Sequence, residues 1–157
     1  MAERFLARSS ALLLLFREGA DGREILLQRR QHTGYADGHW ECAASGHVEA
    51  GETMAEAAIR EAQEELGIAI ERSELRLLTL MHKYTPETGY VYYSGYFTAL
   101  RYRGTPHRRE PEKCAELRWF PLDGLPDGLL EDRRLAIAHA LAGIPYSEWG
   151  WERCPGR

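Results

Sequence analysis

The sequence has no hydrophobic run long enough to span a membrane and no excess of positive charge. The apolar run from Ala11 to Phe16 is far shorter than the roughly 20 residues of a transmembrane helix. It also continues directly into domain sequence, which argues against a signal peptide. The formal net charge of −4 argues against a general nucleic-acid-binding surface, because such a surface needs a concentrated basic patch. We therefore expect neither a membrane nor a nucleic acid among the partners of this protein.

Cysteine is scarce as well. The three residues, Cys42, Cys114 and Cys154, are odd in number, lie far apart and form no CxxC pair. Neither a zinc site nor a disulfide framework is indicated. We expect free thiols and a reducing, cytoplasmic location.

What the sequence does contain is the composition of a globular protein. Its 157 residues are 44% hydrophobic and 28% charged, which provides for a real core and argues against long disorder. We expect a single domain over residues 1–157.

The most informative stretch runs from Gly46 to Ile68. Thr53 and Glu56 have the spacing of a capping box, and Gly67 suits the left-handed stop that follows a last helical turn. These local signals predict a helix from about Met54 to Leu66.

Three carboxylates, Glu61, Glu64 and Glu65, share one face of this helix because their spacing is i, i+3 and i+4. Like charges at this spacing repel, and Glu64 and Glu65 also lie near the negative end of the helix dipole. Such a face is either solvated or neutralised by a divalent cation, and Mg²⁺ prefers carboxylate oxygens, waters and substrate phosphates. The flanking residues favour the cation.

Those flanking residues complete a pattern that resembles the signature of the Nudix (MutT-like) hydrolases. The signature is a Gly, five residues, a Glu, seven residues, Arg-Glu, an aliphatic residue, any residue, Glu-Glu, any residue, a Gly and an aliphatic residue. The matching positions are Gly46, Glu52, Arg60, Glu61, Ala62, Glu64, Glu65, Gly67 and Ile68. Ala62 is smaller than the aliphatic residue that the family usually carries there. Several fixed polar positions at fixed spacing make the signature highly specific.

The resemblance implies an α/β protein with the Nudix fold, an α/β/α sandwich with a mixed, mostly antiparallel central sheet. The sequence is similar to a Nudix domain over a core of about residues 7–144, which leaves a tryptophan-rich tail at 145–157. Two tryptophans in so short a tail usually dock onto their own domain or onto a second copy, so a homodimer is one expectation.

The resemblance also implies a site for Mg²⁺, with Mn²⁺ as a substitute. Its ligands would be the backbone carbonyl of Gly46 and the carboxylates of Glu61, Glu64 and Glu65, which would also carry the catalysis. Two further signature residues, Glu52 and Arg60, would support the site. Arg60 is expected to pair with a carboxylate near the metal and to hold the acidic side chains in position.

Nudix enzymes commonly draw one more acidic residue from a loop that corresponds to residues 104–112 of this chain. We expect Glu112 to be that metal ligand or general base, with Glu110 as the alternative. Glu65 is the other candidate for the general base. The positive run at 107–109 is either solvated or a lid over an anionic substrate.

Strands are predicted on the N-terminal side of the signature. Residues 7–16 predict one buried strand, and a turn at 19–22 leads to a strand at 24–30 that ends in Arg29 and Arg30. These arginines are either solvated or, because this strand runs beside the substrate cleft in Nudix-like folds, in contact with a substrate phosphate.

Three more strands, at 75–84, 90–101 and 115–121, precede a closing helix at 132–142. The middle one alternates tyrosines between its two faces. Each tyrosine is either core or part of a stacking wall for a base, and Tyr92 is our candidate for a substrate contact.

The predicted function is Mg²⁺-dependent hydrolysis of the pyrophosphate linkage in a nucleoside diphosphate bound to another moiety, a small-molecule phosphoanhydride. One alternative is a non-catalytic Nudix module that senses a nucleotide, although such modules typically lose the signature carboxylates. Another is an enzyme that resembles isopentenyl diphosphate isomerase. That enzyme relies on a cysteine well upstream of the signature and on a histidine-rich metal site, whereas Cys42 lies only four residues before Gly46. Nothing in the signature identifies the substrate.

Overall fold

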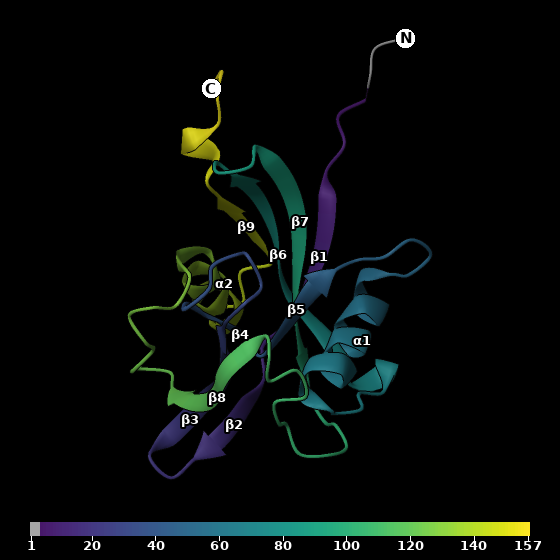
Figure 1. The fold of residues 1–157 in the computed structure, drawn as a ribbon, viewed down its shortest axis with the longest axis vertical. Helices are drawn as coiled ribbons and strands as arrows, with labels where there is room; N and C mark the ends of the chain where they lie inside the picture. Colours follow the sequence, from purple (N-terminus) through teal and green to yellow (C-terminus); the bar gives the residue numbers. More distant parts are fainter. Residues whose placement is uncertain (1–3) are drawn as a thin grey trace.

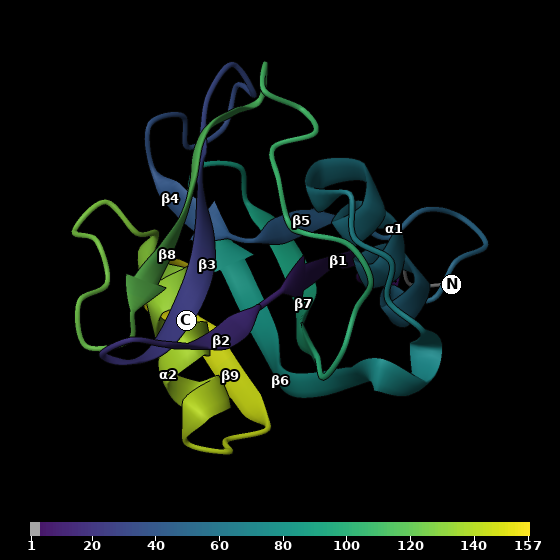
Figure 2. The same ribbon diagram turned by 90° about the horizontal axis from the view of Figure 1, so that it is seen from below.

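Two β-sheets and two α-helices make up the part of the chain that the structure describes, and the helices cover opposite faces of the larger sheet (Figures 1 and 2). The computed structural model describes residues 4–157. In chain order the elements are β1 (Arg8–Leu13), β2 (Phe16–Gly19), β3 (Gly22–Arg30), β4 (Trp40–Cys42), β5 (Ala44–His47), α1 (Met54–Leu66), the 3₁₀ turn η1 (Arg72–Glu74), β6 (Leu75–Thr85), β7 (Tyr90–Ala99), β8 (Cys114–Pro121), α2 (Glu131–Leu141), β9 (Tyr146–Trp149) and the 3₁₀ turn η2 (Trp151–Arg153).

The larger sheet has the strand order β5-β1-β7-β6-β9, and the smaller one joins β2, β3 and β4, with β8 on the other side of β3. β1 runs parallel to β7, and β6 runs parallel to β9. The remaining pairings are antiparallel. The expected sandwich with a mixed, mostly antiparallel sheet is therefore confirmed.

The leucine-rich start of the chain explains why a helix lies on each face of the larger sheet. Leu13 belongs to the hydrophobic cluster that α1 closes, whereas Leu12 and Leu14 belong to the cluster that contains Ile137 of α2. Successive residues of a strand point to opposite faces, so a strand that is buried on both faces has a continuous apolar sequence.

The prediction of one strand over residues 7–16 is wrong in its extent. β1 pairs with β7 as far as Leu13, and a separate strand begins at Phe16 and pairs with β3 of the smaller sheet. Leu14 and Leu15, between the two strands, are fully buried. The chain thus passes from one sheet to the other within a single apolar run, and hydrophobic periodicity cannot reveal such a crossing.

Helix α1 begins and ends where the local signals predict. Glu56 N donates to Thr53 Oγ1 at 3.1 Å and Thr53 N donates to Glu56 Oε2 at 2.6 Å, so the capping box is complete. Gly67 follows the helix with a φ of +69°, a conformation that glycine adopts without steric cost. Ala62 is fully buried on the packed face of the helix. The bounds of β3, β6, β7, β8 and α2 also lie within two residues of the prediction.

The residues after 144 complete the larger sheet. β9 forms its edge beside β6, and Trp151 Nε1 donates to the carbonyl of His82 at 2.8 Å. Trp149 packs against the core on the α2 side. The tail thus docks onto its own domain.

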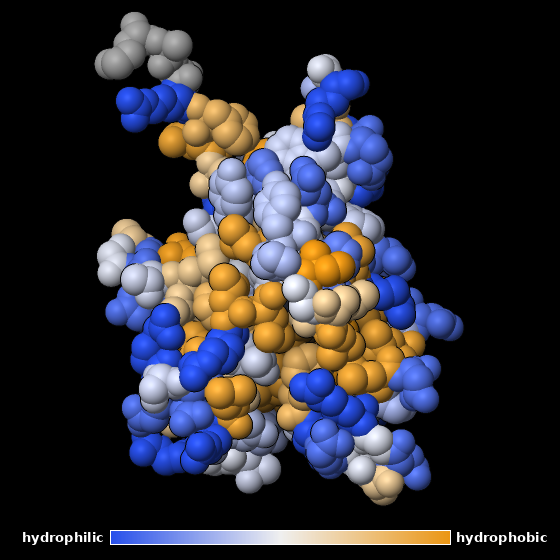
Figure 3. Space-filling model, turned by 180° about the vertical axis from the view of Figure 1, so that it is seen from behind, coloured by the Kyte–Doolittle hydropathy of each residue, from blue (hydrophilic) through white to orange (hydrophobic). Residues whose placement is uncertain are grey.

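Hydrophobic side chains also gather on the surface of the face opposite to that of Figure 1 (Figure 3). Exposed large hydrophobic residues of the chain include Leu77, Leu100, Leu141 and Ile144. Within residues 4–157, no helix combines the length and apolarity needed to cross a membrane.

Candidate functional site

Helix α1 presents its acidic face beside strand β5, and a glycine makes the approach close. A Cβ atom at Gly46 would overlap the carboxylate of Glu61, so a larger residue at this position would displace that side chain. The pairing of β5 with β1 fixes Gly46 opposite Ala11. The sheet therefore holds the backbone of residue 46 against one of the three predicted acidic ligands.

Arg60 connects the acidic side chains to one another. Its Nε and Nη2 donate to Glu52 at 3.1 and 2.7 Å, and its Nη1 lies 2.7 Å from Glu61 Oε1 and 3.3 Å from Glu64 Oε2. Nη2 also donates to the carbonyl of His47 at 3.1 Å. The expected pairing of Arg60 with carboxylates of the site is thus present in the structure, and Glu52 is its bidentate partner.

Glu65 is the most deeply placed carboxyl group of the acidic face. Burial raises its pKa to about 8, and the negative charge of Glu61 adds to this shift. Gln28 Nε2 donates to Glu65 Oε2 at 2.9 Å and Ser45 N donates to the same oxygen at 3.1 Å, which opposes the shift. The folded protein therefore holds the proton of Glu65 more tightly than an exposed glutamate would.

Glu61 and Glu64 lie in more open surroundings. Burial raises the pKa of Glu61, Arg60 lowers it, and the charges of Glu64 and Glu110 raise it further. The side chain of Glu64 is 52% exposed. Within residues 4–157, no three acidic, histidine or cysteine side chains converge as ready-made metal ligands. The carboxylates of α1 are instead turned toward different donors, Arg60 on one side and Gln28 with Ser45 on the other.

The loop over residues 104–112 closes the C-terminal end of α1. His107 N donates to the carbonyl of Leu66 at 3.1 Å and Arg109 N to that of Glu65 at 3.2 Å. Arg109 Nη1 donates to the carbonyl of Gln63 at 3.0 Å, which places a positive charge at the negative end of the helix dipole.

The third residue of the positive run is anchored as well, because Arg108 Nη1 donates to the carbonyls of Cys114 and Ala115. The side chains of the run at 107–109 are exposed, as expected of a solvated segment, and two of the three arginine and histidine residues also anchor it through hydrogen bonds to backbone carbonyls. These hydrogen bonds hold the loop in place.

Anchored in this way, the loop presents Glu110 and not Glu112. Glu110 lines a cavity of about 330 Å³ together with Glu65, Gln28 and Lys113, and Lys113 Nζ lies 3.0 Å from Glu110 Oε1. Glu112 is not among the residues that line it. The lining of this cavity thus favours the alternative, Glu110, over Glu112 as the additional acidic residue, because two residues along an irregular loop are enough to turn a side chain in another direction.

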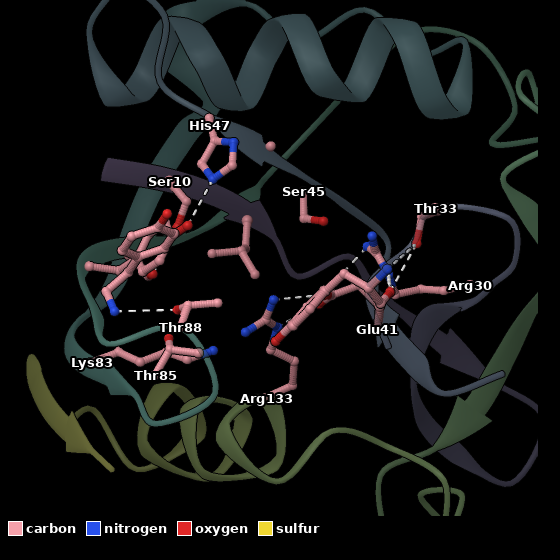
Figure 4. Close-up of a pocket in the computed structure, with 16 residues that line it drawn as sticks. Ser10, Arg30, Thr33, Glu41, Ser45, His47, Lys83, Thr85, Thr88 and Arg133 are labelled. Carbon is pink, nitrogen blue, oxygen red and sulfur yellow. Dashed lines mark hydrogen bonds and ion pairs between the residues drawn. The ribbon is translucent and has the colours of Figure 1, made fainter. Parts of the chain in front are cut away.

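A second cavity has a volume of about 430 Å³, and Figure 4 shows the residues that line it. Three residues, Arg30, Thr33 and Ser45, line both of them. Arg30 Nε donates to the carbonyl of Tyr35 at 2.8 Å, and Figure 4 shows its side chain on the wall opposite Lys83. The two cavities form one cleft with Arg30 at the junction.

Arg29 lies outside this cleft. Neighbouring residues of a strand point to opposite faces, so the side chains of Arg29 and Arg30 leave the sheet on opposite sides. The Arg29 guanidinium lies 3.6 Å from Glu116, its cross-strand neighbour on β8. It lines neither cavity. Of the two predicted phosphate contacts, the structure brings only Arg30 to the site.

The floor of the larger cavity is a buried network of charges. Arg133 of α2 donates through Nε and Nη2 to the two carboxylate oxygens of Glu41, both at 2.6 Å. Asp132 accepts from Arg133 Nη1 and from Lys83 Nζ. Burial alone would raise the pKa of Asp132, but Arg133 and Lys83 together hold it below its ordinary value.

Sequence reasoning missed this network. Glu41 and Arg133 are 92 positions apart, and no motif connects them. The single local signal is the placement of polar residues inside otherwise apolar segments, which also applies to Gln28 in β3.

Aromatic side chains line the other wall of the larger cavity. Tyr92, our candidate for a substrate contact, lines it together with Tyr90. The Tyr92 hydroxyl lies 3.1 Å from His47 Nε2, and the two rings are stacked at 5.7 Å. Tyr96, on the same strand, is fully buried.

Comparison with known proteins adds to this geometry. Residues 6–141 match the family model described as the NUDIX domain. An uncharacterised Nudix hydrolase of Pseudomonas aeruginosa is 32% identical over 137 residues, which covers 85% of this chain and 72% of that protein. The crystal structure of a MutT NUDIX hydrolase from Burkholderia pseudomallei is similar with a TM-score of 0.74 and 30% identity, over 86% of this chain and 98% of that one. The NAD-capped RNA hydrolase NudC of Chromobacterium violaceum is 31% identical over 133 residues, and the match spans 85% of this chain but 44% of NudC.

Proposed function

The chain belongs to the Nudix family of pyrophosphohydrolases, and from this premise we propose that it hydrolyses the pyrophosphate linkage of a nucleoside diphosphate bound to another moiety, with Mg²⁺ as its cofactor. The observation that carries the proposal is the shape of the cleft. Its smaller part contains the acidic residues Glu65 and Glu110, its larger part has hydrogen-bonding and aromatic walls, and Arg30 stands between them. Such a cleft suits a substrate with a recognition group on one side of a phosphoanhydride.

The donor set supports a hard divalent cation. The carboxylates of Glu61, Glu64 and Glu65 lie on one helix, and the close approach of Glu61 to Gly46 brings a backbone segment to the same place. Oxygen donors of this kind suit Mg²⁺, with Mn²⁺ as a substitute. Bound there, the ion would offset the negative charge of the phosphate oxygens and lower the pKa of a water molecule.

The residues of the chain then have separate tasks. Glu65, with its raised pKa, and Glu110 are the candidates that accept the proton of the attacking water. Gln28 and Ser45 orient Glu65, and Arg60 holds Glu61 and Glu64. Arg30 donates to a phosphate oxygen at the junction of the two cavities.

The proposal is tested by a screen for Mg²⁺-dependent release of phosphate or of a nucleoside monophosphate. The substrates are nucleoside triphosphates, nucleotide sugars, dinucleoside polyphosphates and NAD, the last because one relative is described as an NAD-capped RNA hydrolase. Glu64→Gln and Glu65→Gln should each lower turnover by two or more orders of magnitude, since removal of a single electrostatic group of an active site typically costs about 10²–10³-fold.

Glu56→Gln is the matched control on the same helix, because Gln preserves the capping box and lies off the acidic face. Circular dichroism would establish that all three variants are folded. Full activity in both acidic-face variants would refute the proposal.

The two alternatives have less support. Cys42 is fully buried, lines neither cavity, and has a pKa raised well above the ordinary value by burial, so it is unsuited to act as the nucleophilic or acidic thiol of an isomerase. A module that only senses a nucleotide would bind members of the panel without releasing product.

A cytoplasmic location and a homodimer are part of the same proposal. All three cysteines are free, as a reducing compartment would keep them. The exposed hydrophobic side chains on the surface could be buried in an interface with a second copy of the chain.

A further inference from the structure

Two polar side chains of β6 project into the larger cavity without a part in the proposed chemistry. Lys83 and Thr85 are separated by one residue, so they lie on the same face of the strand, and both line the cavity (Figure 4). Lys83 is only 8% exposed and Thr85 only 7%. A buried ammonium group and a buried hydroxyl at the wall of a cavity are candidates for ligand recognition.

The hydroxyl of Thr85 has no hydrogen-bond partner within residues 4–157. A buried hydroxyl that stays unpaired costs free energy, and native proteins keep few of them. Because Thr85 lines the cavity, a polar atom of the bound ligand can serve as the hydrogen-bond partner of its hydroxyl.

The ammonium group of Lys83 is placed as a donor. Its described partner is Asp132, which also accepts from Arg133, so one of its three N–H bonds is used. The carboxylates of Asp132 and Glu41 are occupied by these cations and have little capacity for a further donor. With Arg30, three cationic side chains face two carboxylates, and the floor has one positive charge in excess. It therefore favours an electron-rich acceptor.

The walls favour a flat ligand. Tyr35, Tyr90, Tyr92 and His47 all line the cavity. Aromatic rings offer stacking area to a base, and every base presents a π-face. An acceptor atom on a planar ring matches both the floor and the walls.

We propose that Lys83 and Thr85 select the base of the substrate and favour bases with a ring carbonyl next to a ring N–H. Lys83 Nζ donates to the carbonyl oxygen, and Thr85 Oγ1 accepts from the neighbouring N–H. Hypoxanthine, guanine and uracil offer this pair, whereas adenine and cytosine present an amino group beside an unprotonated ring nitrogen. With those bases, the amino group would face the ammonium of Lys83, donor against donor, and the N–H bonds of Lys83 that Asp132 does not use would find no acceptor on the base. This inference rests on the proposed function.

The test uses two matched pairs of nucleotides that differ at one ring position, inosine triphosphate against ATP and UTP against CTP. We expect kcat/KM in the presence of Mg²⁺ to be about 10-fold or more higher for the carbonyl member of each pair, because an unpaired buried group is costly in a binding site. Thr85→Val, which keeps the shape and removes the hydroxyl, should lower this ratio several-fold. Lys83→Met should bring the ratio of the two kcat/KM values to about 1.

Lys83→Met also removes a partner of the buried Asp132, so Thr85→Val is the variant that does not depend on that ion pair. Thr98→Val, on β7 and outside both cavities, is the matched control and should leave the ratio unchanged. The ratio of the two kcat/KM values is the readout, because a loss of folded protein lowers both values equally.

The outcomes separate the two proposals. If no compound with a pyrophosphate linkage is hydrolysed, the proposed function fails. If nucleotides are hydrolysed but the amino members are equal or better, or if the ratio is the same in Thr85→Val and Lys83→Met as in the wild type, the base-selection proposal is overturned and the hydrolase stands. Exclusive hydrolysis of compounds without a base would overturn it as well.

Discussion

At the scale of single residues, the site depends on where a carboxyl group sits and not only on its presence. Glu61, Glu64 and Glu65 belong to one helical face, yet burial raises the pKa of Glu65 to about 8, whereas Glu64 is half exposed. Burial is the cause of the raised pKa, and it outweighs the hydrogen bonds from Gln28 and Ser45, which act in the opposite direction. Chemically equal side chains on one helical face are thus buried to different extents.

This inequality predicts how stability depends on pH. The folded-state pKa of Glu65 lies above the ordinary value of 4.5, so the folded protein binds more protons than the unfolded chain between about pH 4.5 and 8. The free energy of unfolding of the metal-free protein should therefore fall as pH rises through that window, by up to a few kcal/mol. Glu65→Gln should lack most of this slope, which urea unfolding in EDTA at several pH values would measure.

The same unfolding measurements can be repeated with Mg²⁺ in place of EDTA. Mg²⁺ should increase the free energy of unfolding most near the upper end of this pH window, where Glu65 is ionised and can bind the ion. If the free energy of unfolding depended on pH in the same way in the wild type and in Glu65→Gln, burial of Glu65 would not be the cause of the pH dependence.

At the scale of elements, the strands decide which of two neighbouring residues reaches the cleft. β3 ends in two arginines, and the pleat sends Arg30 to the junction of the cavities while Arg29 faces Glu116 of β8. Sequence reasoning named both, because either can bind a phosphate. Only the pairing of β3 with β4 and β8 distinguishes them.

The two arginines form a matched pair of variants. Arg30→Met should raise KM for a hydrolysed nucleotide about 10-fold or more, since a bidentate charged contact to a phosphate is among the stronger polar interactions. Arg29→Met removes the same charge from the same strand and should leave KM within about twofold. Steady-state kinetics on both proteins would decide, and equal effects would contradict the placement of Arg30 at the junction.

At the scale of the whole molecule, a charge network ties both sheets to α2. Glu41 of β4 in the smaller sheet binds Arg133 of α2, whose neighbour Asp132 binds Lys83 of β6 in the larger sheet. Glu41 is fully buried, and Arg133 is 8% exposed. The network joins three elements that are distant in sequence, and it also forms the floor of the larger cavity.

Breaking this network from one side should be costly. Arg133→Met leaves Glu41 buried without its bidentate partner, and the free energy of unfolding should drop by about 3–5 kcal/mol. The double variant Glu41→Gln/Arg133→Met should recover part of that loss, because it no longer buries a lone charge. Denaturant unfolding of the two proteins is the measurement. A loss below about 1 kcal/mol in the single variant would be evidence against a tightly coupled pair.

The sequence by itself determined helix α1 and the spacing of the carboxylates on its acidic face. A capping box, a glycine stop and carboxylates at i, i+3 and i+4 are interactions within one helical turn, so residue spacing alone specifies them. The bounds of most strands and of α2 followed from periodicity for the same reason, and the residues of the signature were enough to indicate the family.

Only the tertiary structure decided the rest. The crossing between β1 and β2, the placement of Arg30 and Glu110 at the cavities and the pairing of Glu41 with Arg133 all depend on segments far apart in the chain. The physical reason is that sheet register and loop anchoring set the direction in which each side chain points. Neither leaves a pattern in the local sequence.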